Sequence, residues 1–120
     1  MQNSPKDLRK KILGRQGEEL TCKYLKKQGY KILERNYKTP FGEADIVAKS
    51  RDGYTCFVEV KTRTSAEYGL PSEAVNYQKQ KRYRRIALYY VSQVGEEIPV
   101  RFDIASVLNG EIDYFENAYI

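Results

Sequence analysis

Hydrophobic residues recur every three or four positions in two segments of the chain, and this spacing predicts two helices. The first is expected over residues 11–28, because Gly29 follows it and glycine commonly ends a helix. The second is expected over residues 73–93, with Ser72 as its N-cap and Gly95 at its end. The two apolar stripes consist of Leu13, Gly17, Leu20 and Tyr24 in the first helix and of Val75, Arg82, Ile86 and Tyr89 in the second.

The remaining hydrophobic segments are shorter and predict five strands. They cover residues 30–37, 43–49, 54–63, 100–108 and 111–116. A turn at residues 39–42 and a hairpin at Asp52-Gly53 join the first three strands into an antiparallel meander. Asn109-Gly110 is a strong hairpin signal and joins the last two strands. Residues 64–71 have no consistent period and are expected to form an exposed loop.

The order of elements is helix, three strands, helix, two strands. This order is typical of an α/β or α+β fold in which helices pack on a mixed central sheet. No repeat or linker divides the chain, so residues 1–120 are expected to form one domain. Residues 1–10 are polar and precede the first predicted helix, which makes them a candidate disordered basic arm.

Composition narrows the chemistry that such a domain can perform. The chain contains no histidine, and its two cysteines lie far apart, at positions 22 and 56. Common zinc sites and nucleophiles activated by histidine are therefore excluded, which leaves carboxylates, lysine or a hard metal ion. No apolar run is long enough to span a membrane or to serve as a secretory signal, so we expect a cytoplasmic protein that does not bind membranes.

Charged residues interrupt two strands that otherwise look buried. Strict alternation places Glu43, Asp45 and Val47 on one face of their strand and Ala44, Ile46 and Ala48 on the other. In the next strand it separates Phe57, Glu59 and Lys61 from Cys56, Val58 and Val60. If the hairpin register pairs the strands suitably, Asp45, Glu59 and Lys61 meet in a volume that fits one divalent cation.

Two carboxylates on a partly desolvated surface repel each other unless a proton or a cation lies between them. Mg²⁺ prefers oxygen ligands and commonly uses one or two protein carboxylates together with substrate phosphate. Lys61 beside the metal would orient the attacking water and stabilise developing charge, and the expected reaction is phosphodiester hydrolysis. On spacing alone, an exposed ladder of cross-strand ion pairs explains Asp45, Glu59 and Lys61 equally well.

A family resemblance favours the metal site. The run Gly42-Glu43-Ala44-Asp45, followed by Phe57-Val58-Glu59-Val60-Lys61, resembles the D…ExK signature of the PD-(D/E)xK, or restriction-endonuclease-like, nuclease superfamily. Together with Gly14-Arg15-Gln16-Gly17-Glu18-Glu19 and Arg101-Phe102-Asp103, the chain resembles the bacterial YraN family, which is similar in shape to archaeal Holliday-junction resolvases. Ala44 stands where many superfamily members have proline.

The resemblance implies a restriction-endonuclease-like core and a Mg²⁺-dependent or Mn²⁺-dependent endonuclease that acts on branched or structured DNA. By position, Asp45 and Glu59 would be the metal carboxylates, the carbonyl of Val60 a further ligand and Lys61 the catalytic lysine. Glu18 matches an acid that resolvase-like members add to the catalytic site. The helical period places Glu18 beside the apolar stripe and Glu19 towards water. A homodimer is also implied, because junction substrates have two-fold symmetry.

Basic residues offer a surface for the phosphate backbone. Five of the seven residues from Lys79 to Arg85 are basic, and the net charge of the chain is +5. The candidate nucleic-acid-binding residues are Lys79, Lys81, Arg82, Arg85 and Arg63. Tyr68, Tyr77 or Tyr83 are candidates for stacking on unpaired bases, with an ordinary core role as the alternative.

Two other functions remain open at this point. A non-catalytic module with a nuclease fold would bind nucleic acid to assist repair or recombination, and its binding would weaken with salt. A structural adaptor domain would instead bind a protein through a sheet edge or through the segment Tyr89-Tyr90-Val91, and would have no affinity for DNA.

Overall fold

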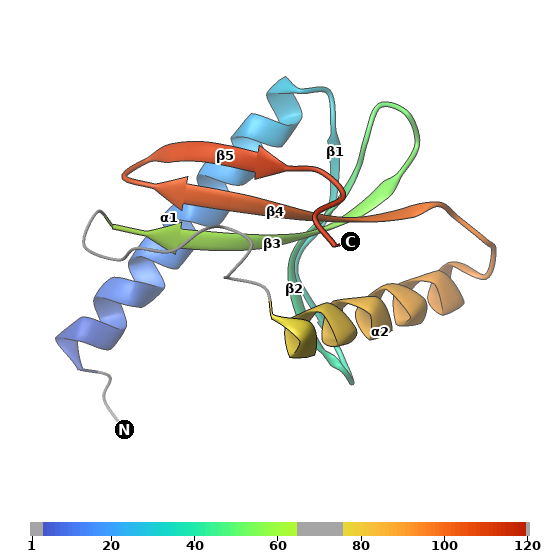
Figure 1. The fold of residues 1–120 in the computed structure, drawn as a ribbon, viewed down its shortest axis with the longest axis horizontal. Helices are drawn as coiled ribbons and strands as arrows, with labels where there is room; N and C mark the ends of the chain where they lie inside the picture. Colours follow the sequence, from blue (N-terminus) through green and yellow to red (C-terminus); the bar gives the residue numbers. More distant parts are fainter. Residues whose placement is uncertain (1–3, 65–75, 120) are drawn as a thin grey trace.

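Two helices cover opposite faces of one five-stranded sheet in the computed structural model, which describes residues 4–64 and 76–119 (Figure 1). The elements are α1 (Pro5–Lys27), β1 (Lys31–Thr39), β2 (Gly42–Lys49), β3 (Thr55–Arg63), α2 (Tyr77–Val94), β4 (Val100–Leu108) and β5 (Glu111–Phe115). The predicted class, with helices packed on a mixed sheet, is confirmed. Within the described ranges no helix combines the length and hydrophobicity that crossing a membrane requires.

The strands follow one another across the sheet in chain order, from β1 to β5. Neighbours are antiparallel except β3 and β4, which are parallel because the chain crosses over through α2 between them. The predicted meander of β1, β2 and β3 is confirmed. The Asn109-Gly110 hairpin is confirmed as well, since Leu108 pairs with Glu111 and both loop residues have positive φ values, 49° and 81°.

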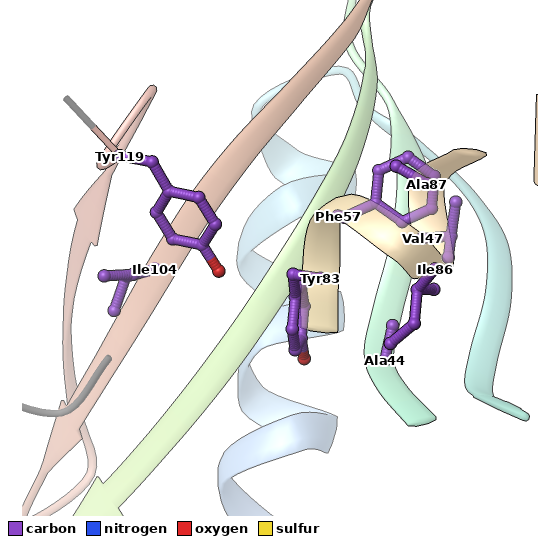
Figure 2. Packing of buried hydrophobic residues seen from close by; sticks show 8 residues of the cluster. All are labelled: Ala44, Val47, Phe57, Tyr83, Ile86, Ala87, Ile104 and Tyr119. Atoms are coloured by element: carbon purple, nitrogen blue, oxygen red, sulfur yellow. The ribbon is translucent and has the colours of Figure 1, made fainter. Parts of the chain in front are cut away.

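Each face of the sheet has its own hydrophobic cluster. The α1 side is built from Cys22, Leu25, Ile46, Ala48, Cys56, Val58 and Ala105. The α2 side contains the residues that Figure 2 shows, in which Tyr83, Ile86 and Ala87 of α2 lie over Ala44, Val47 and Phe57 of the sheet. Both faces are therefore buried, and residues of β2 and β3 alternate between two interiors rather than between interior and water.

Helix α1 begins at Pro5, six residues before the predicted start. Ser4 is the N-cap, and its hydroxyl accepts a hydrogen bond of 3.2 Å from the backbone N–H of Asp7. A serine followed by proline is a typical helix start, although the apolar stripe begins only further along the chain. Residues 5–10 consequently belong to the helix and are not a separate arm, and their side chains are exposed.

Helix α2 begins at Tyr77, after the predicted start at residue 73. Asn76 caps it, because its side-chain oxygen accepts a 3.0 Å hydrogen bond from the N–H of Lys79. Ser72, Val75 and all of the predicted loop except Thr64 lie outside the described residues. The end at Gly95, which has a φ of 82°, is as predicted.

The buried stripe of α2 differs from the predicted one by one position. Tyr83, Ile86 and Ala87 are buried, whereas Arg82 is exposed. The helical period permits either residue 82 or residue 83 as the first member of the stripe. Burying the tyrosine removes a large apolar ring from water and leaves the guanidinium solvated.

Gly17 is a point of close approach between α1 and β3. A Cβ atom built on Gly17 would overlap Oγ1 of Thr62. One turn later, the buried hydroxyl of Thr21 donates a 2.7 Å hydrogen bond to the carbonyl of Gly17, so this hydroxyl has a polar partner. The absence of a side chain at position 17 sets how near the neighbouring Glu18 lies to the sheet.

We expect Gly17→Ala to destabilise the protein by about 1–3 kcal/mol, because overpacking a close contact costs more than the gain in helix propensity. Gly14→Ala is the matched control. A Cβ at Gly14 meets no described atom within 4 Å, so this change should stabilise the helix by about 0.5–1 kcal/mol. Urea denaturation of the two variants measures both values. Adding Thr62→Ala should restore the stability lost in Gly17→Ala, and an equal effect of the two glycine changes would contradict the close contact.

Candidate functional site

The strands β2 and β3 separate next to Asp45 and Glu59. Their ladder ends at the pair Ile46 and Val58, and Asp45 lies just beyond it. In place of a backbone partner, the N–H of Val60 donates a 2.8 Å hydrogen bond to Oδ2 of Asp45. The carboxylate of Asp45 thus lies between the two strands, in the opening where they diverge.

This divergence corrects the strict alternation predicted for β2. Ala44 and Val47 belong to the same cluster on the α2 side, although they are three residues apart, while Ile46 and Ala48 belong to the α1 side. Alternation therefore breaks between Ala44 and Val47. A strand that leaves its neighbour loses the pairing that keeps its pleat regular, and the Asp45 carboxylate consequently reaches the backbone of Val60 on β3.

Glu59 is held by two side chains of α2. The residue is 8% exposed; Oε2 accepts a 2.6 Å hydrogen bond from the hydroxyl of Tyr83, and Oε1 lies 2.7 Å from Nζ of Lys79. The same Tyr83 hydroxyl accepts a 3.2 Å hydrogen bond from the N–H of Asp45. Tyr83 therefore connects both acids of the site to α2.

Tyr83 is a site residue that sequence reasoning missed. It was a candidate for stacking on bases, but its side chain is 1% exposed, so that prediction is wrong. A buried tyrosine hydroxyl needs a polar partner, and here the partners are the N–H of Asp45 and the carboxylate of Glu59. The available signal was its position one helical turn after Lys79, on the same side of α2.

Burial and the nearby charge of Glu59 raise the pKa of Asp45 from its ordinary 3.8 to about 7, and the hydrogen bond from Val60 only partly opposes this rise. Removing a carboxylate from water disfavours its charged form, and a second carboxylate nearby adds repulsion. Asp45 and Glu59 are therefore close enough to compete for one proton or to share one cation.

This raised pKa predicts that Asp45 destabilises the native state near neutral pH. Below about pH 4, both native and unfolded forms hold the proton; between about pH 4 and pH 7 only the native form holds it, so stability falls as pH rises through that window. We expect Asp45→Asn, which keeps an oxygen to accept from Val60, to be more stable than the parent by about 2 kcal/mol at pH 8. At pH 4 the two proteins should unfold alike. Melting temperatures at both values measure this difference, and a pH-independent difference would contradict the raised pKa.

Glu18 reaches the edge of the same site from α1. It is half-buried, and Glu19 is exposed, as the helical period predicted. Burial raises the pKa of Glu18, opposed by the charge of Arg35, and the charge of Glu18 in turn contributes to the raised pKa of Asp45. Nevertheless, among the described residues no three Cys, Asp or Glu side chains form a group able to hold a metal ion. Glu18 is thus near the acid pair without completing a three-carboxylate set.

Lys61 follows Glu59 by two residues on β3, so the two residues share a face of that strand. Its side chain is half-buried. Val60 lies between them and already gives its N–H to Asp45. The order Glu59, Val60, Lys61 therefore places an acid, a backbone group and an ammonium next to the diverging strands.

Comparison with known proteins identifies the family of this chain. The model of the uncharacterised protein family UPF0102 matches residues 17–107, which include Glu18, Asp45, Glu59 and Lys61. The chain belongs to the UPF0102 family. It is 47% identical over 107 residues to a UPF0102 protein of Thermodesulfovibrio yellowstonii, an alignment that covers 89% of this chain and 95% of that one. UPF0102 proteins of Alkaliphilus metalliredigens and Lachnoclostridium phytofermentans are each 46% identical, over 91% and 93% of this chain and 98% and 96% of theirs.

The predicted nucleic-acid-binding residues on α2 of this UPF0102 chain fall into two groups. Lys79 lies inside the site, paired with Glu59. Lys81, Arg82 and Arg85 are exposed on α2; Nζ of Lys81 lies 5.4 Å from the ring centre of Tyr77, and the side-chain carbons of Arg82 pack over Gly42.

The other predicted contacts lie apart from this group. Arg63 is half-buried at the end of β3. Tyr77 is 66% exposed and can stack on a base, whereas Tyr68 lies outside the described residues. The structure therefore brings Glu18, Asp45, Glu59 and Lys79 together and leaves most of the basic residues on the nearby surface of α2.

Proposed function

We propose that this protein is a Mg²⁺-dependent or Mn²⁺-dependent endonuclease that hydrolyses phosphodiester bonds in branched or structured DNA. The observation that carries this proposal is the approach of the Asp45 and Glu59 carboxylates where β2 and β3 diverge, with Lys61 on the same strand face as Glu59. The similarity of these residues to the D…ExK signature of the PD-(D/E)xK nucleases supports the assignment. Membership of the UPF0102 family does not conflict with this assignment.

The donor set fits a hard divalent cation. Glu59 is buried and Asp45 is half-buried, the charge of Glu59 disfavours ionisation of Asp45, and a cation between them would relieve that repulsion. Mg²⁺ is commonly held by one or two protein carboxylates and keeps several waters, so a third carboxylate is not required. Asp45, Glu59 and the carbonyl of Val60 would hold the ion, which would supply an activated water and stabilise charge on the phosphate.

The residues around this pair would position and neutralise the substrate. Tyr83 fixes the orientation of Glu59 through a 2.6 Å hydrogen bond. Lys79 lies 2.7 Å from the other oxygen of Glu59, where its ammonium is also available to a phosphate. Lys61 would orient the attacking water and balance the charge that develops on the phosphate oxygens.

The exposed surface of α2 would supply contacts to the DNA backbone. Lys81, Arg82 and Arg85 bind phosphates without regard to sequence, and Arg63 would extend this surface from β3. Such a protein would work in the cytoplasm on chromosomal DNA. A two-fold symmetric junction would favour a homodimer, which size-exclusion chromatography with light scattering tests directly.

Calorimetric titration with Mn²⁺ tests the metal site. The parent should bind one ion, and the folded double variant Asp45→Ala, Glu59→Ala should lose binding. The matched control is Glu111→Ala, Asp113→Ala, which removes two exposed acids from β5. Equal Mn²⁺ affinity in the parent and the site variant would remove the metal site. Cleavage is then tested with branched, nicked and single-stranded DNA in the presence of Mg²⁺.

A non-catalytic nucleic-acid-binding module is the second candidate. The ion pair between Lys79 and Glu59 favours it, because an ammonium already neutralises one of the two carboxylates. This function predicts DNA binding that weakens with salt, occurs without cleavage and does not change in Lys61→Ala. Filter binding at two salt concentrations, with and without Mg²⁺, separates the two candidates.

A further inference from the structure

Asn36 has an unusual backbone conformation for a residue within a strand. It lies inside β1 and has a φ of +50°, in the left-handed region that residues other than glycine seldom adopt. Asparagine tolerates this region better than most residues do, yet the conformation still costs free energy. Such a conformation persists where surrounding contacts require it, and it often occurs at functional sites.

The register of the sheet places Asn36 next to the candidate site. Arg35 pairs with Ile46, and Tyr37 pairs with Ala44, so Asn36 is level with Asp45 on the neighbouring strand. The unusual conformation in β1 therefore lies beside the point where β2 leaves β3. These two irregularities of the sheet therefore occur side by side.

The side chain of Asn36 connects two carboxylates from different elements. With its amide nitrogen turned towards them, it donates a 3.0 Å hydrogen bond to Oε1 of Glu18 on α1 and a 3.2 Å hydrogen bond to Oε1 of Glu43 on β2. An amide NH₂ has two donors and no formal charge, so it can satisfy two carboxylates at once. A lysine or arginine in its place would add a net charge beside the acid pair.

Without such a donor, Glu18 and Glu43 would repel each other. The charge of Glu43 disfavours ionisation of Glu18, and Glu18 acts in the same way on Asp45. Four acids thus influence one another in series, from Glu43 through Glu18 to Asp45 and Glu59. The amide of Asn36 binds the first two of them. Glu43 joins the site through this contact, although it was not one of the predicted site residues.

We propose that Asn36 is a positioning residue that uses its amide to fix Glu18 and Glu43 at the rim of the Asp45 and Glu59 pair. This inference rests on the proposed metal-dependent function. The left-handed backbone turns the amide towards α1, and the resulting contacts hold Glu18 beside Asp45. Residues that orient the groups around a metal commonly change its affinity 10-fold to 100-fold when removed.

The test compares Mn²⁺ binding in the parent and in Asn36→Gly. Glycine adopts the same φ without strain, so this variant removes the amide and keeps the backbone. We expect it to remain folded and to bind Mn²⁺ about 10-fold more weakly. Asn109→Gly is the matched control, because Asn109 has a φ of 49° in the hairpin between β4 and β5, and its replacement should leave Mn²⁺ affinity unchanged.

A second comparison shows whether Asn36 acts through the carboxylates. In a Glu18→Ala, Glu43→Ala background, Asn36→Gly should cause no further loss of Mn²⁺ affinity, because the groups that it positions are absent. An additional 10-fold loss in that background, or unchanged affinity of Asn36→Gly alone, overturns the assignment of Asn36 while the metal site stands. If the parent itself binds no Mn²⁺, the proposed metal-dependent function fails, and the role of Asn36 fails with it.

Discussion

Replacing Lys61 with alanine is expected to lower the rate of Mg²⁺-dependent DNA cleavage at least about 100-fold, with little change in Mn²⁺ affinity. Lys61 shares a strand face with Glu59, and its ammonium group has no lone pair with which to bind a metal ion. Its ammonium would act on the attacking water and on the phosphate as charge develops, so its loss should affect turnover more than binding. Single-turnover cleavage of a labelled junction measures the rate, and calorimetry measures the affinity.

Lys49→Ala is the matched control for this experiment. Lys49 is exposed at the far end of β2, where it pairs with Thr55, so the variant removes the same charge at a distance from the acids. Cleavage by Lys49→Ala should stay within about 2-fold of the parent, as expected for an exposed charge away from the site. If Lys61→Ala cleaves as fast as Lys49→Ala, the lysine is not catalytic and the binding-module candidate is preferred.

A loss of about 3–5 kcal/mol in stability is expected for Asp103→Ala, because it would remove the buried carboxylate that Arg101, Tyr114 and Asn117 share as an acceptor. Asp103 is fully buried on β4, and Arg101 binds its carboxylate at 2.9 Å through Nη2 and at 3.0 Å through Nε. The hydroxyl of Tyr114 and the N–H of Asn117 also donate to it, at 2.6 Å and 2.9 Å. This carboxylate therefore connects β4 with β5 and with the segment that follows β5.

Thermal denaturation is the measurement, and the melting temperature should fall by about 10 °C or more. Asp103→Asn keeps the shape and the acceptor oxygen, so it should lose less. Glu19→Ala serves as the control, because its ion pair with Arg35 spans 3.5 Å between exposed side chains and should contribute less than about 1 kcal/mol. Similar losses in Asp103→Ala and Glu19→Ala would show that the buried network is not important for stability.

Much of the fold could be predicted because its signals are local. Asn109-Gly110 determines its own hairpin, and the orientations of Glu18 and Glu19 follow from the helical period. Hydrophobic spacing does not predict the start of α1, because the Ser4-Pro5 cap lies more than a turn before the apolar stripe.

The site could be predicted only in part because it depends on contacts between distant elements. Asp45 and Glu59 are recognisable from their motif, but the divergence of β2 from β3 is a property of the folded sheet. Tyr83 and Lys79 reach Glu59 only because α2 packs over that divergence. The side-chain contact of Asn36 with Glu18 likewise joins two elements that are distant in the sequence. No local pattern encodes these relations.

The parallel pairing of β3 with β4 has a consequence for the order of folding. The meander of β1, β2 and β3 involves only near neighbours in sequence and can form early, whereas β4 joins only after the chain has passed through α2. Glu59 forms its hydrogen bonds with Tyr83 and Lys79 during that late step. A nascent chain interrupted before residue 77 would therefore contain both acids of the motif but lack the two side chains of α2 that bind Glu59.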